Sequence, residues 1–156
     1  MPDWPVQSRP FRGGARAHAV IPPIVLLLSF GYSQRVPPPA NFSLDVRSAP
    51  NPLRIPEFRG LSVLDESVQK WMLAELDSWF DGLLDTLGPQ LADAESRDSR
   101  ALTWAFGCTT GHDQSVVLAE LVGAAIRRTG TTVCIKHLDL ATETMQHDAD
   151  RVVIAP

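Results

Sequence analysis

The chain has 156 residues, of which 44% are hydrophobic and 21% charged, as is ordinary for one globular domain with tails. Residues 1–40 carry four arginines against one acid, a net charge of +3, and the rest carries ten basic and seventeen acidic side chains, a net charge of −7. Nucleic-acid recognition normally relies on clustered Lys and Arg, so this charge argues against RNA or DNA as the main partner.

The first 22 residues are rich in Pro, Gly and Arg without a period, which predicts a disordered tail over 1–22. Arginines precede an apolar run in the order of a signal peptide, but Pro22–Pro23 interrupts the run and no cleavage site follows it. The uninterrupted part, Ile24–Leu28, is too short to span a bilayer, so we expect a core strand and no membrane partner. The two cysteines form no disulfide framework, which favours a cytoplasmic location.

Two strands are predicted in the first half of the chain. The continuous apolar run Ile24–Phe30 is typical of a strand covered on both faces. The prolines at 37–39 form a stiff extended connector, and Phe42–Val46 alternates as a second strand. The motif Pro50-Asn-Pro52 then predicts an irregular loop, because each proline restricts the residue before it.

A long amphipathic helix follows. Ser62 and Asp65 have the spacing of a capping box, with Ser62 as the N-cap. Apolar residues recur at helical spacing from Val68 to Leu87, and Gly88–Pro89 is expected to end the helix. Residues 94–100 are predicted to be a polar loop.

The second half repeats the alternation of strand and helix. Leu102–Phe106 is predicted as a strand, Asp113–Arg128 as a helix closed by Gly130, and Thr131–Ile135 as a fourth, buried strand. The last residues, 143–156, are expected to be a tail in which Val152–Ile154 forms either a short edge strand or a frayed end.

Strands joined through helices predict a single α/β domain over residues 23–142. The expected architecture is a mainly parallel sheet of about four strands flanked by two main helices. In such sheets ligands bind at the carboxyl ends of the strands. Polar residues follow three of the predicted strands, so we expect them to share one rim.

The most informative stretch of this rim is Gly107-Cys-Thr-Thr-Gly-His-Asp-Gln-Ser-Val116, where a strand passes through a small-residue turn into a helix. A helix N-terminus presents unpaired N–H groups and the positive end of the macrodipole, and this geometry favours an anion. The predicted ligand-binding residues are Asp45, Arg47, Asn51, Cys108, Thr109, Thr110, Gly111, His112, Gln114 and Ser115. Simpler roles stay open: Asp45 and Arg47 could pair with each other, and Asn51 could cap its own turn.

The residues of this turn do not fit two more specific chemistries. A cysteine phosphatase needs the spacing C-x5-R, but Gln114 occupies the arginine position and supplies no charge, so the sequence argues against phosphoryl transfer. The candidate metal ligands His112, Asp113, His137 and Asp139 lack a diagnostic spacing, so no metal is predicted.

The motifs, taken in order, resemble a known family. Ser29-Phe-Gly-Tyr32, Asp45-Val-Arg47, Pro50-Asn-Pro52, the turn above and Lys136-His-Leu-Asp-Leu140 are similar to the C-terminal domain of the RapZ family of RNase adapter and P-loop nucleotide-binding proteins. The resemblance covers about residues 24–140. It implies an α/β domain that forms oligomers and is associated with RNA and an amino-sugar phosphate. The family's ATP and GTP chemistry belongs to a preceding P-loop domain, and no P-loop motif occurs here, so we expect a free-standing C-terminal domain without ATP turnover.

The chain departs from the family pattern GCTGGxHRSV at three positions: Thr110 replaces a glycine, Asp113 a histidine and Gln114 an arginine. The last two changes remove positive charge where a phosphate would sit. In the family motif RHRDL, Lys136 and Leu138 replace the two arginines.

The sequence therefore predicts a non-catalytic regulatory domain that binds a small anionic, sugar-phosphate-like metabolite at the turn 107–115. It is expected to use no cofactor and to form a homo-oligomer. Two alternatives stay open: an RNA-binding or RNase-adapter module, and a protein-interaction domain with a degenerate pocket.

Overall fold

The structure is a computed structural model that describes residues 21–140. The predicted N-terminal tail, apart from its last two residues, and the tail containing Val152–Ile154 lie outside the described residues. The elements, in chain order, are β1 (Ile24–Gly31), β2 (Phe42–Asp45), the short 3-10 helices η1 (Pro52–Arg54) and η2 (Pro56–Phe58), α1 (Glu66–Leu76), α2 (Ser78–Ser96), β3 (Ala101–Cys108), α3 (Gln114–Arg127) and β4 (Val133–His137).

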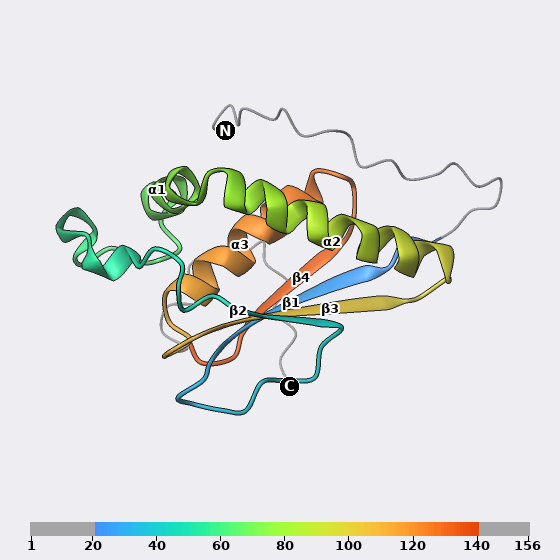
Figure 1. The fold of residues 1–156 in the computed structure, drawn as a ribbon, viewed down its shortest axis with the longest axis horizontal. Helices are drawn as coiled ribbons and strands as arrows, with labels where there is room; N and C mark the ends of the chain where they lie inside the picture. The colour runs from blue at the N-terminus through green and yellow to red at the C-terminus, as the bar shows by residue number, and fades with distance from the viewer. Residues whose placement is uncertain (1–20, 141–156) are drawn as a thin grey trace.

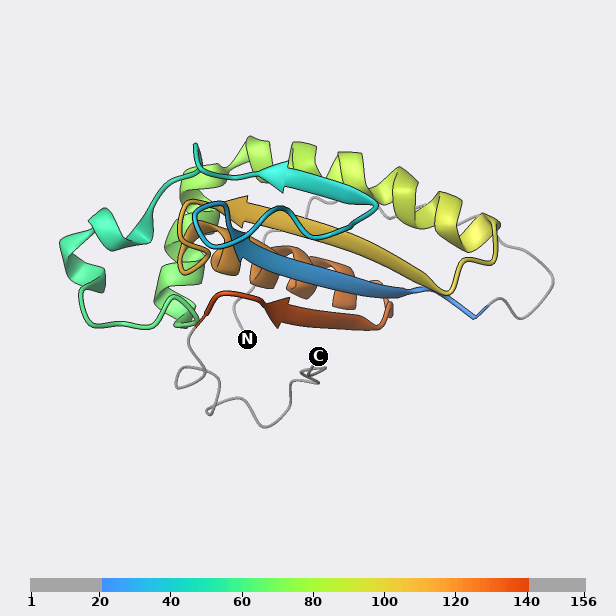
Figure 2. The same cartoon turned by 90° about the horizontal axis from the view of Figure 1, so that it is seen from below.

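The four strands form one parallel sheet in the order β2-β3-β1-β4, which confirms the predicted fold class. The central strand β1 pairs with β3 along its whole length, from Ile24 opposite Ala101 to Gly31 opposite Cys108. All the strands point the same way, so their carboxyl ends meet at one edge of the sheet (Figure 2).

All three helices lie on the same side of the sheet, where α2 and α3 pack on the strands and α1 packs on α3 and α2, and the connection from β1 to β2 runs past the other face (Figure 1). Val25 and Leu27 of β1 belong to the main core beneath the helices, whereas Leu28 and Phe30 form a smaller cluster with Ala105. Both faces of β1 are therefore buried, as its continuous apolar sequence predicts.

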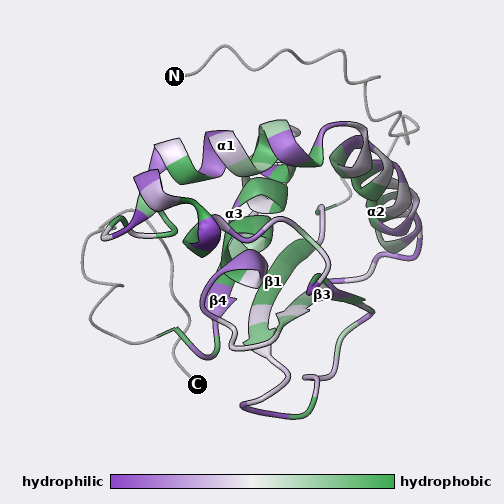
Figure 3. Cartoon of the chain, turned by 60° about the vertical axis from the view of Figure 1, so that its left-hand side comes forward, coloured by the Kyte–Doolittle hydropathy of each residue, from purple (hydrophilic) through white to green (hydrophobic). Residues whose placement is uncertain are grey.

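Helix α3 is the most buried of the three helices. Every residue from Gln114 to Gly123 is buried, because α3 packs against β1, β3 and β4 and is crossed by α1. Helix α3 and the central strands are mostly hydrophobic, whereas α1 and α2 alternate hydrophobic and hydrophilic residues (Figure 3).

The long helix predicted to end at Gly88–Pro89 is instead two helices, so three helices flank the sheet rather than two. The break falls at Asp77, whose backbone has φ 42° and ψ −126°. Pro89 lies inside α2, which continues to Ser96 and takes up the first part of the predicted polar loop. Burial of Leu87 and Leu91, on either side of Pro89, offsets the one backbone hydrogen bond that the proline removes.

The helix after the predicted capping box begins one turn later than expected, at Glu66. Asp65 accepts a hydrogen bond from the Ser62 N–H at 3.1 Å, and Ser62 Oγ accepts one from the Leu64 N–H at 3.1 Å. These bonds close a turn before α1, and the N-cap is Asp65 rather than Ser62. Gly130, with φ +85°, closes the chain after α3 as predicted.

Strand β4 is shifted by two residues from its predicted position. The sequence predicts Thr131–Ile135, and the strand runs from Val133 to His137. The shift brings His137 into the sheet, opposite Ser29 of β1. Within residues 21–140, no helix is both long and apolar enough to cross a membrane.

Pro89→Ala is expected to raise the free energy of unfolding by up to about 3 kcal/mol, because proline in a helix interior costs roughly that much relative to alanine. Urea unfolding measures the change. Asp85→Ala, at an exposed position of the same helix, is the control and should stay within about 0.5 kcal/mol of the parent. A loss of stability in Pro89→Ala would show that α2 depends on the proline geometry.

Candidate functional site

The parallel register places the predicted site residues after strand ends at one edge of the sheet. Gly31 lies opposite Cys108, and Asp45 lies opposite Gly107. The loops that follow β1, β2 and β3 therefore meet at the carboxyl edge, together with the end of β4. This edge, with its four following segments, is called the rim below.

Two glycines bring the rim segments into close contact. A Cβ added at Gly31 would overlap the carbonyl group of Thr110 and lie 2.7 Å from the Gly111 nitrogen. Gly111 has φ +79°, and a Cβ there would lie 2.6 Å from the Gly31 nitrogen. The turn at 108–111 is thus packed backbone to backbone against the end of β1, which only glycine permits.

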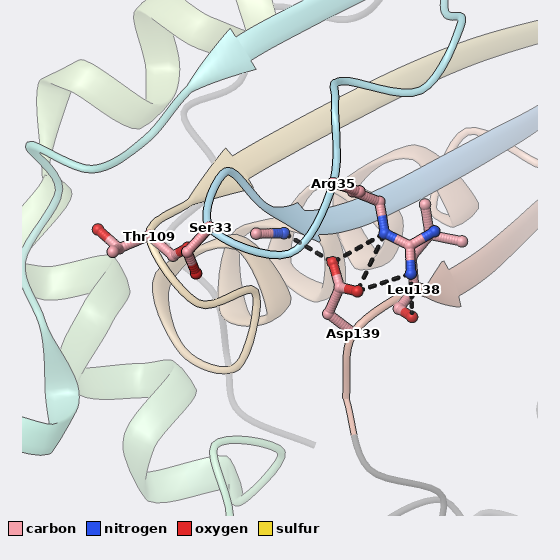
Figure 4. Close-up of polar contacts among 6 residues, drawn as sticks. Ser33, Arg35, Thr109, Leu138 and Asp139 are labelled. Atoms are coloured by element: carbon pink, nitrogen blue, oxygen red, sulfur yellow. Dashed lines mark hydrogen bonds and ion pairs between the residues drawn. The ribbon is translucent and has the colours of Figure 1, made fainter.

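Hydrogen bonds continue this contact along the loop after β1. The N–H of Tyr32 donates to Cys108 O at 2.9 Å, and the N–H and Oγ of Ser33 donate to Thr109 O at 3.0 and 2.7 Å. Figure 4 shows Ser33 beside Thr109. Residues 31–33 therefore form one wall of the turn.

The thiol of Cys108 faces inward. Its Sγ lies 3.1 Å from Ser115 Oγ and accepts a hydrogen bond from the Gly111 N–H at 3.3 Å. Cys108 is 1% exposed, so these contacts shape the turn from within rather than present a thiol to a ligand.

An ion pair that the sequence did not suggest joins the loop after β1 to the end of β4. Arg35 donates from Nε and Nη2 to the carboxylate of Asp139, and Nη2 also donates to Leu138 O at 3.0 Å (Figure 4). Asp139 Oδ2 accepts from the Gly31 N–H at 2.8 Å. Burial raises the pKa of Asp139, but the hydrogen bonds from Arg35 and Gly31 outweigh it and hold that pKa below its usual value. The sequence names Asp139 as a candidate metal ligand and predicts no partner for Arg35.

Arg47 pairs with Asp45, which is the simpler of the two roles left open by the sequence. Its Nε and Nη2 donate to the two carboxylate oxygens at 3.0 and 2.6 Å, and its guanidinium carbon lies 4.5 Å from the centre of the Tyr32 ring. The hydrogen bonds from Arg47 hold the pKa of Asp45 below its usual value. Burial, together with the charge of Asp45, raises the pKa of Tyr32.

Tyr32 in turn rests on the sheet. Its ring meets Phe30 edge to face at 5.0 Å between centroids, and a Cβ added at Gly107 would lie 2.6 Å from the Tyr32 ring. Gly107 therefore leaves room for the rings of Phe30 and Tyr32, and Arg47 lies over the Tyr32 ring.

Gln114 ties the loop after β2 to α3. Its Nε2 donates to Ala49 O at 2.7 Å and to Arg47 O at 3.2 Å, and the residue is 8% exposed. Asn51 accepts from the Leu53 N–H at 2.9 Å and caps η1, so its side chain serves its own turn.

The N-terminus of α3 completes the rim. The first hydrogen bond of this helix runs from Val117 N–H to Asp113 O, at 3.0 Å, and leaves the N–H groups of Gln114, Ser115 and Val116 outside the helical ladder. Asp113 caps the backbone without a side-chain hydrogen bond. Burial raises the pKa of its carboxyl group, against the opposing charge of His112. Thr109 and His112 are exposed, and Thr110 is half-buried.

The arrangement offers helix-terminal amides, the exposed hydroxyl groups of Ser33 and Thr109, and two rim arginines, Arg35 and Arg47. In the described part of the chain, no three His, Cys, Asp or Glu side chains gather in a way that could hold a metal ion. Such a set suits the binding of a small polar molecule by hydrogen bonds.

Comparison with known proteins places this geometry in a family. The family model described as the RapZ C-terminal domain matches residues 23–141. The chain belongs to this family. It is 36% identical over 121 residues to a nucleotide-binding protein of Salinispora tropica, which corresponds to 76% of this chain and 40% of that protein.

Other relatives of the domain give the same picture. A nucleotide-binding protein of Pseudomonas fluorescens is 35% identical over 118 residues, with 74% of this chain and 41% of the relative covered. One from Leifsonia xyli is 36% identical over 122 residues, with 76% and 41% covered. The chain thus spans about two fifths of the length of these relatives, whose names describe whole proteins.

Gly31→Ala and Gly82→Ala form a matched pair that tests the contact beneath the rim. Gly31→Ala is expected to lower the free energy of unfolding by about 1–3 kcal/mol or more, because the new Cβ meets backbone that cannot move aside. Gly82→Ala, in exposed α2 with open space around it, should raise it by about 0.5–1 kcal/mol. Urea unfolding of both variants measures the difference, and equal effects would show that the turn yields to a side chain at position 31.

Proposed function

We propose that this chain is a regulatory domain that binds a small anionic metabolite, such as a sugar phosphate, at the turn 107–115. The observation that supports this most directly is the N-terminus of α3. Three N–H groups there lie outside the helical ladder, next to a turn whose exposed residues, Thr109 and His112, are polar. Oriented amides at the positive end of a helix dipole favour an anion without any side-chain charge.

The rim arginines would contribute less than their number suggests. Arg35 and Arg47 are each bound to a carboxylate, Asp139 and Asp45, so each pair carries no net charge. An anion that approaches Arg47 must compete with Asp45 for the same N–H groups. We therefore expect the helix-terminal amides to make the larger contribution and the affinity to be modest.

The proposed role is binding rather than catalysis. Cys108, the strongest nucleophile in the turn, is buried and hydrogen-bonded to Ser115 and Gly111. A covalent mechanism would require this thiol to be exposed and deprotonated. The absence of ATP turnover, a cytoplasmic location, self-association and the RNA-adapter alternative remain predictions from the sequence and its resemblance.

Gln114→Arg is expected to tighten the binding of a hexose 6-phosphate about tenfold or more. A charge-assisted hydrogen bond contributes roughly 1.5–3 kcal/mol where a partner is present. Gln114 uses only donors toward Ala49 and Arg47, and arginine can keep those donations. Arg47→Ala should weaken binding by a smaller factor, because Asp45 already accepts from the same N–H groups. Isothermal titration calorimetry measures all three proteins.

Thr86→Arg is the control for this experiment, since it adds the same charge on the exposed face of α2. It should leave the affinity unchanged. If Gln114→Arg gains nothing over Thr86→Arg and Arg47→Ala loses nothing, the turn does not bind an anion in this protein.

A further inference from the structure

Beneath the rim, three buried polar side chains form a continuous hydrogen-bonded chain. Ser29 Oγ of β1 lies 2.7 Å from Nδ1 of His137 in β4, and His137 Nε2 lies 2.9 Å from Glu120 Oε1 in α3. Ser29 is 0% exposed, and the side chains of His137 and Glu120 are 6% and 3% exposed. The site described above uses none of these three groups.

The direction of the hydrogen bonds depends on which ring nitrogen of His137 carries hydrogen. Where Glu120 is an ionised carboxylate it can only accept, and the hydrogen between Glu120 and His137 is then on Nε2. In the neutral ring Nδ1 is then an acceptor, and the hydroxyl of Ser29 donates to it. Each of the two bonds therefore has one donor and one acceptor.

The same three residue types occur in hydrolytic triads, but Ser29, His137 and Glu120 do not form a nucleophilic centre. A serine nucleophile must reach its substrate, and the Ser29 hydroxyl is enclosed in the protein. Ser29 must therefore act through the elements that the hydrogen bonds join, β1, β4 and α3.

Burying these groups is costly, which makes their presence informative. A buried carboxylate loses its hydration and regains it only through well-formed hydrogen bonds, and apolar side chains of similar volume often stabilise a core as well or better. Hydrogen bonds differ from apolar contacts in being directional. The apolar contact between α3 and the sheet is close nearby, where a Cβ added at Gly123 would lie 2.7 Å from Cδ1 of Ile135.

The three hydrogen-bonded residues lie directly beneath the rim. Gly31 lies two residues after Ser29, and Asp139 lies two residues after His137. The Gly31 N–H donates a 2.8 Å hydrogen bond to Asp139. Between these two links, Leu138 N–H donates to Ser29 O at 2.9 Å. Gln114 is the first residue of α3, and Glu120 lies fewer than two helical turns after it.

We propose that Ser29, His137 and Glu120 are positioning residues that hold the start of α3 in register with the ends of β1 and β4. They fix the turn at 108–113 without touching its ligand. The inference concerns the protein without ligand, and only its consequence for affinity rests on the proposed function.

Hydrogen exchange tests the proposal on three variants. Ser29→Ala and Glu120→Leu remove one link each, because neither new side chain can donate or accept a hydrogen bond there. They are expected to lower the protection of the Gly31, Tyr32 and Ser33 amides, whose hydrogen bonds hold the rim together, by about tenfold relative to the protection of β3. Leu91→Ala, in the part of the core under α2, should lower stability and leave that relative protection unchanged.

A second measurement needs no variant. Nitrogen-15 NMR of the intact protein should show His137 protonated at Nε2 and unprotonated at Nδ1. The opposite tautomer, or rim protection that is unchanged in Ser29→Ala or falls equally in Leu91→Ala, would overturn the proposal.

Titration of each variant with inorganic phosphate and a hexose 6-phosphate separates this inference from the proposed function. If rim protection falls as expected and the parent protein binds neither compound, the proposed function fails and the positioning role stands. If the parent binds, Ser29→Ala should bind about tenfold more weakly and Leu91→Ala equally well.

Discussion

The rim depends on one backbone contact, the approach of Gly31 to the Thr110–Gly111 peptide. No side chain fits between these segments, so the end of β1 directly determines where the turn after β3 can lie. Gly31 also donates its N–H to Asp139, which brings the end of β4 to the same point. Three strand ends thus converge on two glycines, and the N-terminus of α3 follows from the turn that they fix.

The charges around this contact are balanced in pairs. Asp139 binds Arg35, and Asp45 binds Arg47, so the rim presents arginines without presenting a strong positive field. Each pair also has a mechanical role: the first joins the loop after β1 to β4, and the second holds Arg47 over Tyr32. The chain belongs to the RapZ C-terminal domain family, and its paired arginines explain why we propose amides rather than guanidinium groups as the main anion contact.

Local patterns were sufficient to predict the parallel sheet, because three strands are mainly apolar runs, Phe42–Val46 alternates in polarity, and helices join later strands. They failed where tertiary packing overrides propensity: Pro89 lies inside α2 because Leu87 and Leu91 are buried on both sides of it. The links from Arg35 to Asp139 and from Ser29 to His137 join residues more than one hundred positions apart, and no periodicity or motif encodes such a pairing. The rim was predictable as a place, but the partners of its side chains were not.

The most direct test of the proposed ligand site is an NMR titration of nitrogen-15-labelled protein with a hexose 6-phosphate. The account predicts saturable shift changes that are largest at the amides of Thr109–Val116, with smaller changes at Gly31–Ser33, which form the adjoining wall. Saturable changes centred on another part of the domain, or none at millimolar ligand, would contradict it.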